Sequence, residues 1–535
     1  MAPRVYRGDS SQLLQHPNHL VNRTLERHTV GKVRRQRRAV GLLAAAVISV
    51  IGFVALAFTS VGAPASGIAL VVLIGCIVAA SIRPINGLYA IVFLGLVGDA
   101  VITPWFPFVK NFSSAESLLY ISNELSLSPL EILVAMTLVF WLIELKITPG
   151  RTMVRRPLVN AVGLFTCFVA IGFVYGIARG GDFRVAMFEG RAMFVLLPVY
   201  ALIINLCDRR TLRLLVWTAL SAIFLNAILA LIYLQNLTAV DLDQIESLGE
   251  HSAATQWNVL ILITLMLFLY GGGTRPARLM LLAMCVPTLM VYLASQRRSA
   301  VAGLVIALGF VALSLWWRNR QRFIAVVPML VVLTIGYTGA FWNSTSPAGF
   351  PAQAIKSIVA SSESSEADRS SDEYRVIENF DLNYTIQASP ILGLGFGQKF
   401  YRPYPLPDIS FFEFYEYIPH NSFMWIWIKT GFGGFLSMLA MMGLAVRAGT
   451  RSLVRSRDDT EAVLAILGIT IVVMFAVFAF VDIAWSPQNM VLLALGFGLC
   501  SQVPKEDSEP GTDESVSEPE FEPGHARRTA EPFRR

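Results

Sequence analysis

Two adjacent arginines are the first residues of this sequence whose type suggests chemistry. Arg297 and Arg298 stand in the stretch "LASQRRSAVAG", between two runs of apolar residues. An arginine in the middle of a bilayer costs roughly 2.5–3.5 kcal/mol on insertion scales, so a pair is better tolerated at a membrane edge. Guanidinium groups bind phosphate in a bidentate manner and are always charged. The pair is therefore either an interfacial anchor for lipid phosphates or an anion-binding site.

A histidine at the start of an apolar run is the second candidate. His420 and Asn421 open the stretch "HNSFMWIWIKTGFGGFL". An imidazole that is neutral near pH 7 can accept a proton from a hydroxyl group. A lone histidine at a helix start more often caps the helix or fills a core position. The residues alone leave both interpretations of His420 open.

Three glycines at alternate positions lie upstream of this histidine. Gly393, Gly395 and Gly397 occur in "SPILGLGFGQKF". No Gly-Lys-Ser or Gly-Lys-Thr follows them, so the pattern does not indicate a nucleotide-binding loop. We expect a tight backbone turn near the membrane surface, because glycine adopts backbone angles that other residues avoid.

The composition of the chain indicates a membrane protein. Its 535 residues are 55% hydrophobic and 15% charged, and the mean hydropathy is +0.58. We expect an all-α polytopic membrane protein with about fourteen transmembrane helices (twelve to fourteen) and one long outer loop. The predicted spans lie near 39–59, 66–82, 85–102, 128–146, 157–177, 185–207, 211–234, 257–271, 277–294, 299–316, 323–340, 420–446, 460–482 and 487–501.

The predicted organisation has five parts. They are a basic cytoplasmic arm (1–38), helices 1–11 (39–340), a long extracytoplasmic loop (341–419), helices 12–14 (420–501) and an acidic, disordered cytoplasmic tail (502–535).

The distribution of Lys and Arg predicts how the chain is oriented. The arm before the first span carries nine of them, and every second loop after it is basic. By the positive-inside rule, both termini lie in the cytoplasm of a multi-pass plasma-membrane protein. The net charge of +6 then reflects topology and contact with anionic lipids, and nucleic acid is not expected as a partner. The Arg297–Arg298 pair falls on the outer side, where it breaks the bias of the other loops.

Three stretches together resemble a known membrane family. They are "YLASQRRSAVAGL", "DEYRVIENFDLNYTIQASPILGLGFG" and "PHNSFMWIWIKTGFGGF". The combination is similar to the O-antigen ligases and Wzy-type O-antigen polymerases of the C-type membrane glycosyltransferase superfamily. The resemblance covers about 290–435, and upstream of it only the hydropathy is similar.

The resemblance implies an enzyme that works on the outer face of the membrane. Such enzymes move a glycan from an undecaprenyl-diphosphate donor to an acceptor hydroxyl, which belongs to another lipid-linked glycan in a polymerase and to a different molecule in a ligase. In this chain His420 would be the catalytic base, supported by Asn421. The residues expected to bind the donor diphosphate are Arg297, Arg298, Arg191 and Arg375. Many relatives have one arginine where this chain has Arg297 and Arg298, so which of the two contacts the donor stays open.

We expect no metal and no cofactor. Metal-dependent members of the superfamily carry acidic residues in the first outer loop, whereas this chain has "VGAPASG" there. The five cysteines lie in or at the ends of apolar spans, without metal-type spacing. Asp182 and Glu189 are expected to pair with neighbouring arginines.

Two other classes of function compete with glycan transfer. A flippase for lipid-linked oligosaccharides also has about fourteen spans, but it should carry ionisable residues deep within several of them and show a repeat between its halves. The sequence shows neither feature. A structural protein of the cell envelope would leave the outer arginines and His420 unexplained.

Overall fold

The computed structural model describes most of the chain as helices. The described residues are 64–150, 152–154, 156–237, 248–250, 252–295, 297–344, 346–360, 366–407 and 413–502. The predicted basic arm and first span, nearly all of the tail and His251 lie outside these residues. Within them the structure contains no strand, which confirms the all-α class.

The helices of the N-terminal half follow the predicted spans. They are α2 (Pro64–Ile82), α3 (Pro84–Val97), α4 (Pro129–Ile147), α5 (Pro157–Ala178), α6 (Phe183–Gly190), α7 (Met193–Leu206), α8 (Arg209–Leu237) and α9 (Ala253–Tyr270).

The remaining helices form the C-terminal half. They are α10 (Arg275–Ala294), α11 (Arg298–Arg318), α12 (Arg320–Ala340), the short 3-10 helix η2 (Pro347–Gly349), α13 (Phe350–Val359), α14 (Glu366–Ala388), α15 (Ser422–Val454), α16 (Asp459–Val481) and α17 (Pro487–Cys500).

Nine helical segments in the described part of the chain are long and apolar enough to cross a membrane. The multi-pass class is therefore confirmed, whereas the count of fourteen stays a prediction. α3 has 14 residues and is shorter than the predicted span 85–102, whereas α17, also with 14 residues, agrees with the predicted span 487–501. At a rise of about 1.5 Å per residue, such a helix covers roughly 21 Å of a hydrocarbon core of about 30 Å.

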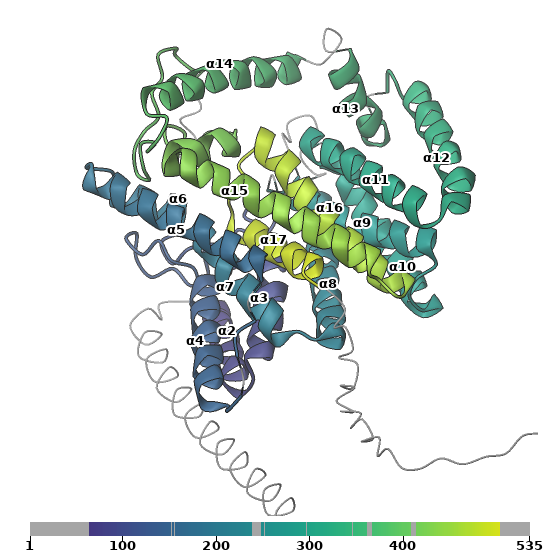
Figure 1. Ribbon diagram of the computed structural model, residues 1–535. Helices are drawn as coiled ribbons and strands as arrows, with labels where there is room; N and C mark the ends of the chain where they lie inside the picture. Colours follow the sequence, from purple (N-terminus) through teal and green to yellow (C-terminus); the bar gives the residue numbers. More distant parts are fainter. Residues whose placement is uncertain are drawn as a thin grey trace, which may run out of the picture.

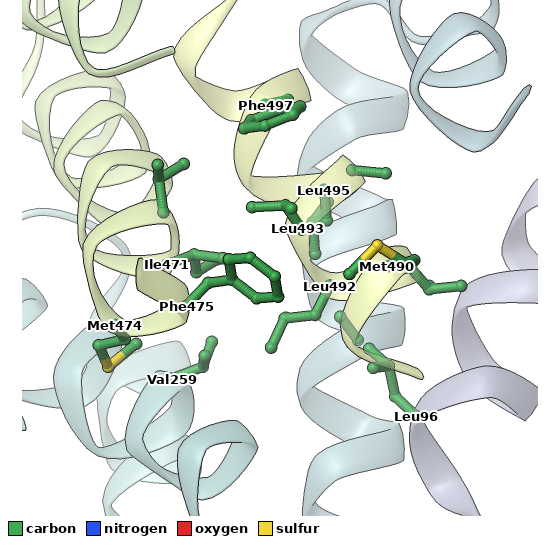
Figure 2. Packing of buried hydrophobic residues seen from close by; sticks show 14 of the residues in the cluster. Leu96, Val259, Ile471, Met474, Phe475, Met490, Leu492, Leu493, Leu495 and Phe497 are labelled. Carbon is green, nitrogen blue, oxygen red and sulfur yellow. The ribbon is translucent and has the colours of Figure 1, made fainter. Parts of the chain in front are cut away.

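The core of the bundle is formed by helices that are apolar on every side. Phe475 of α16 packs among apolar residues of α9 and α17, as Figure 2 shows. Small residues let α16 and α17 approach closely: a Cβ atom added to Gly468 would lie 2.9 Å from the backbone oxygen of Gly496. Close backbone contact at small residues is a common way for transmembrane helices to associate. In contrast, α12 has no buried residue and stands at the edge of the molecule (Figure 1).

The segment predicted as a long outer loop contains helices in its described part. α13 and α14 lie within 341–419, and α14 packs beside the start of α15 (Figure 1). Val376, Phe380 and Tyr384 fall at helical spacing in α14, and all three are exposed. The buried face of α14 carries other residues, among them the acidic Glu378 and Asp381.

Candidate functional site

His420 is held by one carboxylate that lies 42 residues earlier in the chain. Its backbone N–H donates to Glu378 Oε2 over 3.0 Å, and its ring Nδ1 lies 3.2 Å from Glu378 Oε1. The side chain of Glu378 is 2% exposed and that of His420 is 26% exposed. Glu378 therefore fixes both the backbone and the ring of His420, while part of the imidazole stays accessible.

This pairing determines which ring nitrogen can act as a base. An ionised carboxylate only accepts hydrogen bonds, so Nδ1 of His420 carries the hydrogen and Nε2 is left with a free lone pair. Burial lowers the pKa of His420, whereas the hydrogen bond and the negative charge of Glu378 raise it. Together the raising effects outweigh burial, and the pKa lies above the ordinary 6.5. Tyr374 stands edge-on to the imidazole, with the ring centres 5.5 Å apart. The arrangement is that of an oriented general base.

Asn421 has a structural role at the start of α15. Its Oδ1 accepts a hydrogen bond from the backbone N–H of Met424 over 3.1 Å, which caps the helix. Its Nδ2 donates to Asn379 Oδ1 over 3.0 Å. Since Asn379 follows Glu378 on α14, Asn421 joins the two helices that carry the histidine and its carboxylate.

Two of the predicted arginines share one carboxylate. Arg298 begins α11, and its Nη1 and Nη2 donate to Asp372 Oδ2 and Oδ1 over 3.3 and 3.1 Å. Arg375 Nη1 lies 3.6 Å from the same Oδ1 of Asp372. One negative charge thus faces two positive charges, and all three side chains are partly exposed. Both guanidinium groups therefore keep part of their surface accessible to an anion.

Arg297 points away from Asp372 and toward the bundle. Its Nη2 donates to the backbone oxygen of Gly249 over 3.3 Å. Burial lowers the pKa of Arg297, whereas the carboxylates of Asp482 and Asp99 raise it and the charge of Arg375 lowers it. Asp482 and Arg375 also act on the pKa of His420. Asp482 and Arg375 therefore lie within electrostatic reach of both Arg297 and His420.

Arg191 is not part of this group. It follows α6, where its Nη1 lies 3.5 Å from Glu131 Oε1 and donates to the backbone oxygen of Ser126 over 3.2 Å. Glu131 belongs to the capping box at the start of α4. The guanidinium also lies over the ring of Phe188, 5.3 Å from its centre. These contacts tie Arg191 to α4 and not to His420 or the arginine cluster.

The part of the chain that brings these residues together has known relatives. Residues 279–439 match a family model described as O-antigen ligase. This part of the chain is similar to the O-antigen ligase family. The matched range runs from α10 into α15. It includes the His420–Glu378 pair and the arginines 297, 298 and 375, whereas Arg191 lies outside it. No curated protein matches the chain.

The family model matches less than half of the chain, so it shows a similarity of one segment. The chain as a whole is a multi-pass membrane protein, and residues 279–439 resemble a family described as O-antigen ligase.

A glycine turn fastens the segment between α14 and α15 to the bundle. Gly393, Gly395 and Gly397 have φ angles of +71°, +87° and +77°, which confirms the expected tight turn. The turn inserts against α5: the N–H of Phe396 donates to the backbone oxygen of Gly172 over 3.2 Å. A Cβ atom added to Gly395 would lie 2.3 Å from the Cα of Gly176.

A buried ion pair supports the same turn. Lys429 Nζ lies 2.7 Å from Glu189 Oε1, and both side chains are fully buried. Lys429 also donates to the backbone oxygen of Gln398, while the N–H of Gly397 donates to Glu189. The expectation that Glu189 pairs with an arginine is therefore wrong, because Lys429, about two turns into α15, forms the ion pair with it. Asp182 instead caps α6 by accepting from the N–H of Val185.

The two carboxylates of the site, Glu378 and Asp372, were not predicted from the sequence. Glu378 and Asp372 lie in the acidic stretch "SDEYRVIENFD", where they look like solvated helix residues. A signal was present, since Tyr374, Glu378 and Leu382 recur at a spacing of four and form the buried face of α14. A carboxylate on an otherwise buried face must have a partner, and His420 is the partner here.

Proposed function

We propose that the chain transfers a glycan from an undecaprenyl-diphosphate-linked donor to a sugar hydroxyl of an acceptor, on the outer face of the plasma membrane. The observation that carries this proposal is the oriented His420–Glu378 pair beside the Arg298–Asp372–Arg375 cluster, within the segment that is similar to the O-antigen ligase family.

The reaction needs a base for the acceptor. Nε2 of His420 takes the proton of the acceptor hydroxyl as its oxygen forms a bond to the anomeric carbon of the donor sugar. The bond from that carbon to the diphosphate oxygen breaks, and the diphosphate keeps the electron pair. Glu378 stabilises the imidazolium that forms, because its negative charge lies against Nδ1.

The leaving diphosphate needs fixed positive charge. Arg298 and Arg375 supply it at the start of α11, where the helix N-terminus also favours an anion. Asp372 holds both guanidinium groups in position and yields to the diphosphate, whose greater charge competes for the same donors. Arg297, held by Gly249, contributes to the positive potential from deeper in the bundle.

The role of Arg191 in this proposal differs from that of the cluster. Its contacts with Glu131 and Ser126 place it at the start of α4. We therefore assign donor binding to Arg298 and Arg375, with Arg297 behind them, and we assign Arg191 to the packing of α4.

The reaction itself is tested with purified protein in liposomes. Labelled undecaprenyl-diphosphate oligosaccharide from the native host is supplied alone or together with a host envelope extract. A polymerase lengthens the lipid-linked glycan when the donor is alone, whereas a ligase moves the label only when the extract supplies an acceptor. Movement of intact donor between leaflets without glycan transfer would instead support a flippase and refute the proposal.

A further inference from the structure

A cavity lies at the membrane end opposite to His420. It is bounded by α8, α9, α10 and α16 and has a volume of about 380 Å³. α10 and α16 run from this cavity to the functional site: α10 begins at Arg275 beside the cavity and ends just before Arg297, while α16 ends just before Asp482 (Figure 1). The cavity is therefore separate from the proposed donor site, by the length of these helices.

The residues that line the cavity are ordered by polarity. Its mouth is formed by Arg213, Gly273 and Thr274, which are exposed, and by Thr460, which is half-buried. The N–H of Gly273 donates to Thr460 Oγ1 over 3.2 Å and so joins α16 to the loop before α10. The deeper wall is apolar and consists of Val216, Trp217, Leu220, Ile263, Leu267, Ala277, Leu281, Val463 and Leu464.

This order of polar mouth and apolar wall fits an amphiphile. From Arg213 to Leu220, α8 advances seven residues, or about 10 Å, into the membrane region. Volumes of about 300–1,000 Å³ with few polar groups are typical of small-molecule sites. A fully polar ligand would leave its groups unpaired against the apolar wall, at a cost in free energy. The cavity therefore fits a molecule with one polar end and a hydrocarbon chain.

The charge at the mouth favours an anionic head group. Arg213 is 46% exposed and forms only a long ion pair, 3.8 Å, with Asp458. Arg210 and Arg275 lie at the same ends of α8 and α10, while Arg209 at the start of α8 pairs with Glu461. Each basic residue near a membrane surface contributes roughly 1 kcal/mol of attraction to anionic lipid. A phosphate can share Arg213 with Asp458 or replace Asp458.

We propose that this cavity is a binding site for one anionic phospholipid, with the phosphate at Arg213 and an acyl chain between α8, α9, α10 and α16. The lipid bridges four helices, two of which lead to the functional site. The proposal does not depend on the reaction that the chain performs.

Native mass spectrometry of the purified full chain tests the site. The probes are phosphatidylglycerol and phosphatidylcholine with identical acyl chains. We expect the protein to retain phosphatidylglycerol preferentially. Arg213→Gln should weaken phosphatidylglycerol binding about fivefold and leave phosphatidylcholine binding unchanged. Ala277→Trp fills the apolar part and should weaken the binding of both lipids.

Two matched variants separate this site from the general attraction of lipids. Arg320→Gln removes an exposed arginine that lies at the same membrane end but does not line the cavity. Leu279→Trp adds an indole to α10 on the side away from the cavity, where Leu279 is 57% exposed. Equal losses in Arg213→Gln and Arg320→Gln would overturn the proposal. So would equal retention of both lipids by the unmodified protein, or unchanged retention in Ala277→Trp. If Ala277→Trp does not fold, the comparison of the two arginine variants decides alone.

Discussion

At the scale of single residues, the His420–Glu378 pair links the fold to the chemistry. Both oxygens of Glu378 contact His420, one at the backbone N–H and one at Nδ1. A base held in this way loses little entropy when the acceptor hydroxyl arrives. The same carboxylate sets the pH at which the base works, since it raises the pKa of His420 against the effect of burial.

The pH dependence of transfer should therefore respond to Glu378. The base must be unprotonated, so the rate rises with pH through the pKa of His420, which lies above 6.5. In Glu378→Gln the negative charge is lost, the pKa of His420 falls and the rising limb moves to lower pH, while the maximal rate also falls. Glu373→Gln, at an exposed position on α14, is the control and should leave the profile unchanged. If the rising part of the pH–rate profile stays at the same pH in Glu378→Gln, Glu378 does not influence the pKa of the base.

The arginine cluster makes a prediction about donor binding. Arg298 holds Asp372 through two nitrogens, and a diphosphate would use the same fork. Lysine keeps the charge but not the fork, so Arg298→Lys should weaken binding of undecaprenyl diphosphate by about tenfold. Arg184→Lys, an exposed surface arginine, serves as the control. Equal affinity of the Arg298→Lys variant and the unmodified protein would leave Arg298 as an interfacial anchor.

At the scale of elements, the glycine turn positions the segment that leads from α14 to α15. Its carbonyl and N–H groups bond to α5 and α15, and its glycines leave room for the backbone of α5. The fully buried Lys429–Glu189 pair fixes the other side of the turn. The position of His420 therefore also depends on residues outside the proposed reaction site, namely the glycine turn and the Lys429–Glu189 pair.

Replacing a turn glycine should destabilise the protein. Gly395→Ala places a Cβ atom against the backbone of Gly176 at a φ of +87°, so we expect a loss of about 3 kcal/mol in the free energy of unfolding. Gly309→Ala in α11 is the control, because no atom lies within 4 Å of its new Cβ atom. Thermal unfolding in detergent compares the two variants. Equal midpoints would show that the turn adjusts to a side chain.

Sequence reasoning predicted the elements better than the partners. Apolar runs located the helices, because hydropathy in a membrane protein is set by the bilayer. His420, Arg298 and Arg375 could be chosen by residue type and by the family pattern. Glu378 could not, since its link to His420 arises only when α14 packs beside the start of α15. Arg191 was predicted with the same group by its type, and the structure places it against Glu131 at the start of α4.

At the scale of the whole molecule, the helices place the His420 site and a group of basic residues at opposite ends of the bundle. The starts of α11 and α15 and the end of α16 meet at the His420 site, while the ends of α11 and the starts of α12 and α16 lie at the basic end. Arg318, at the basic end of α11, pairs with Asp459 at the start of α16. This arrangement agrees with the positive-inside rule if His420 faces outward.

Reporter fusions test that orientation. A reporter fused after Arg320 should be active only in the cytoplasm, and one fused after Ala388 only outside it, because α12 begins at the basic end and α14 lies beside the start of α15. Activity on the same side for both fusions would refute the proposed orientation of the site.

The central claim is that His420 removes the proton from the acceptor and contributes little to donor binding. Its most direct test is glycan transfer by purified His420→Gln, with binding of undecaprenyl diphosphate measured on the same sample. Glutamine can keep a hydrogen bond to Glu378 but cannot accept a proton at neutral pH. We therefore expect the transfer rate to fall by about 10²–10⁴-fold while donor affinity is unchanged. Transfer near the rate of the unmodified protein would contradict the base assignment, and a loss of donor binding would place His420 in the diphosphate site instead.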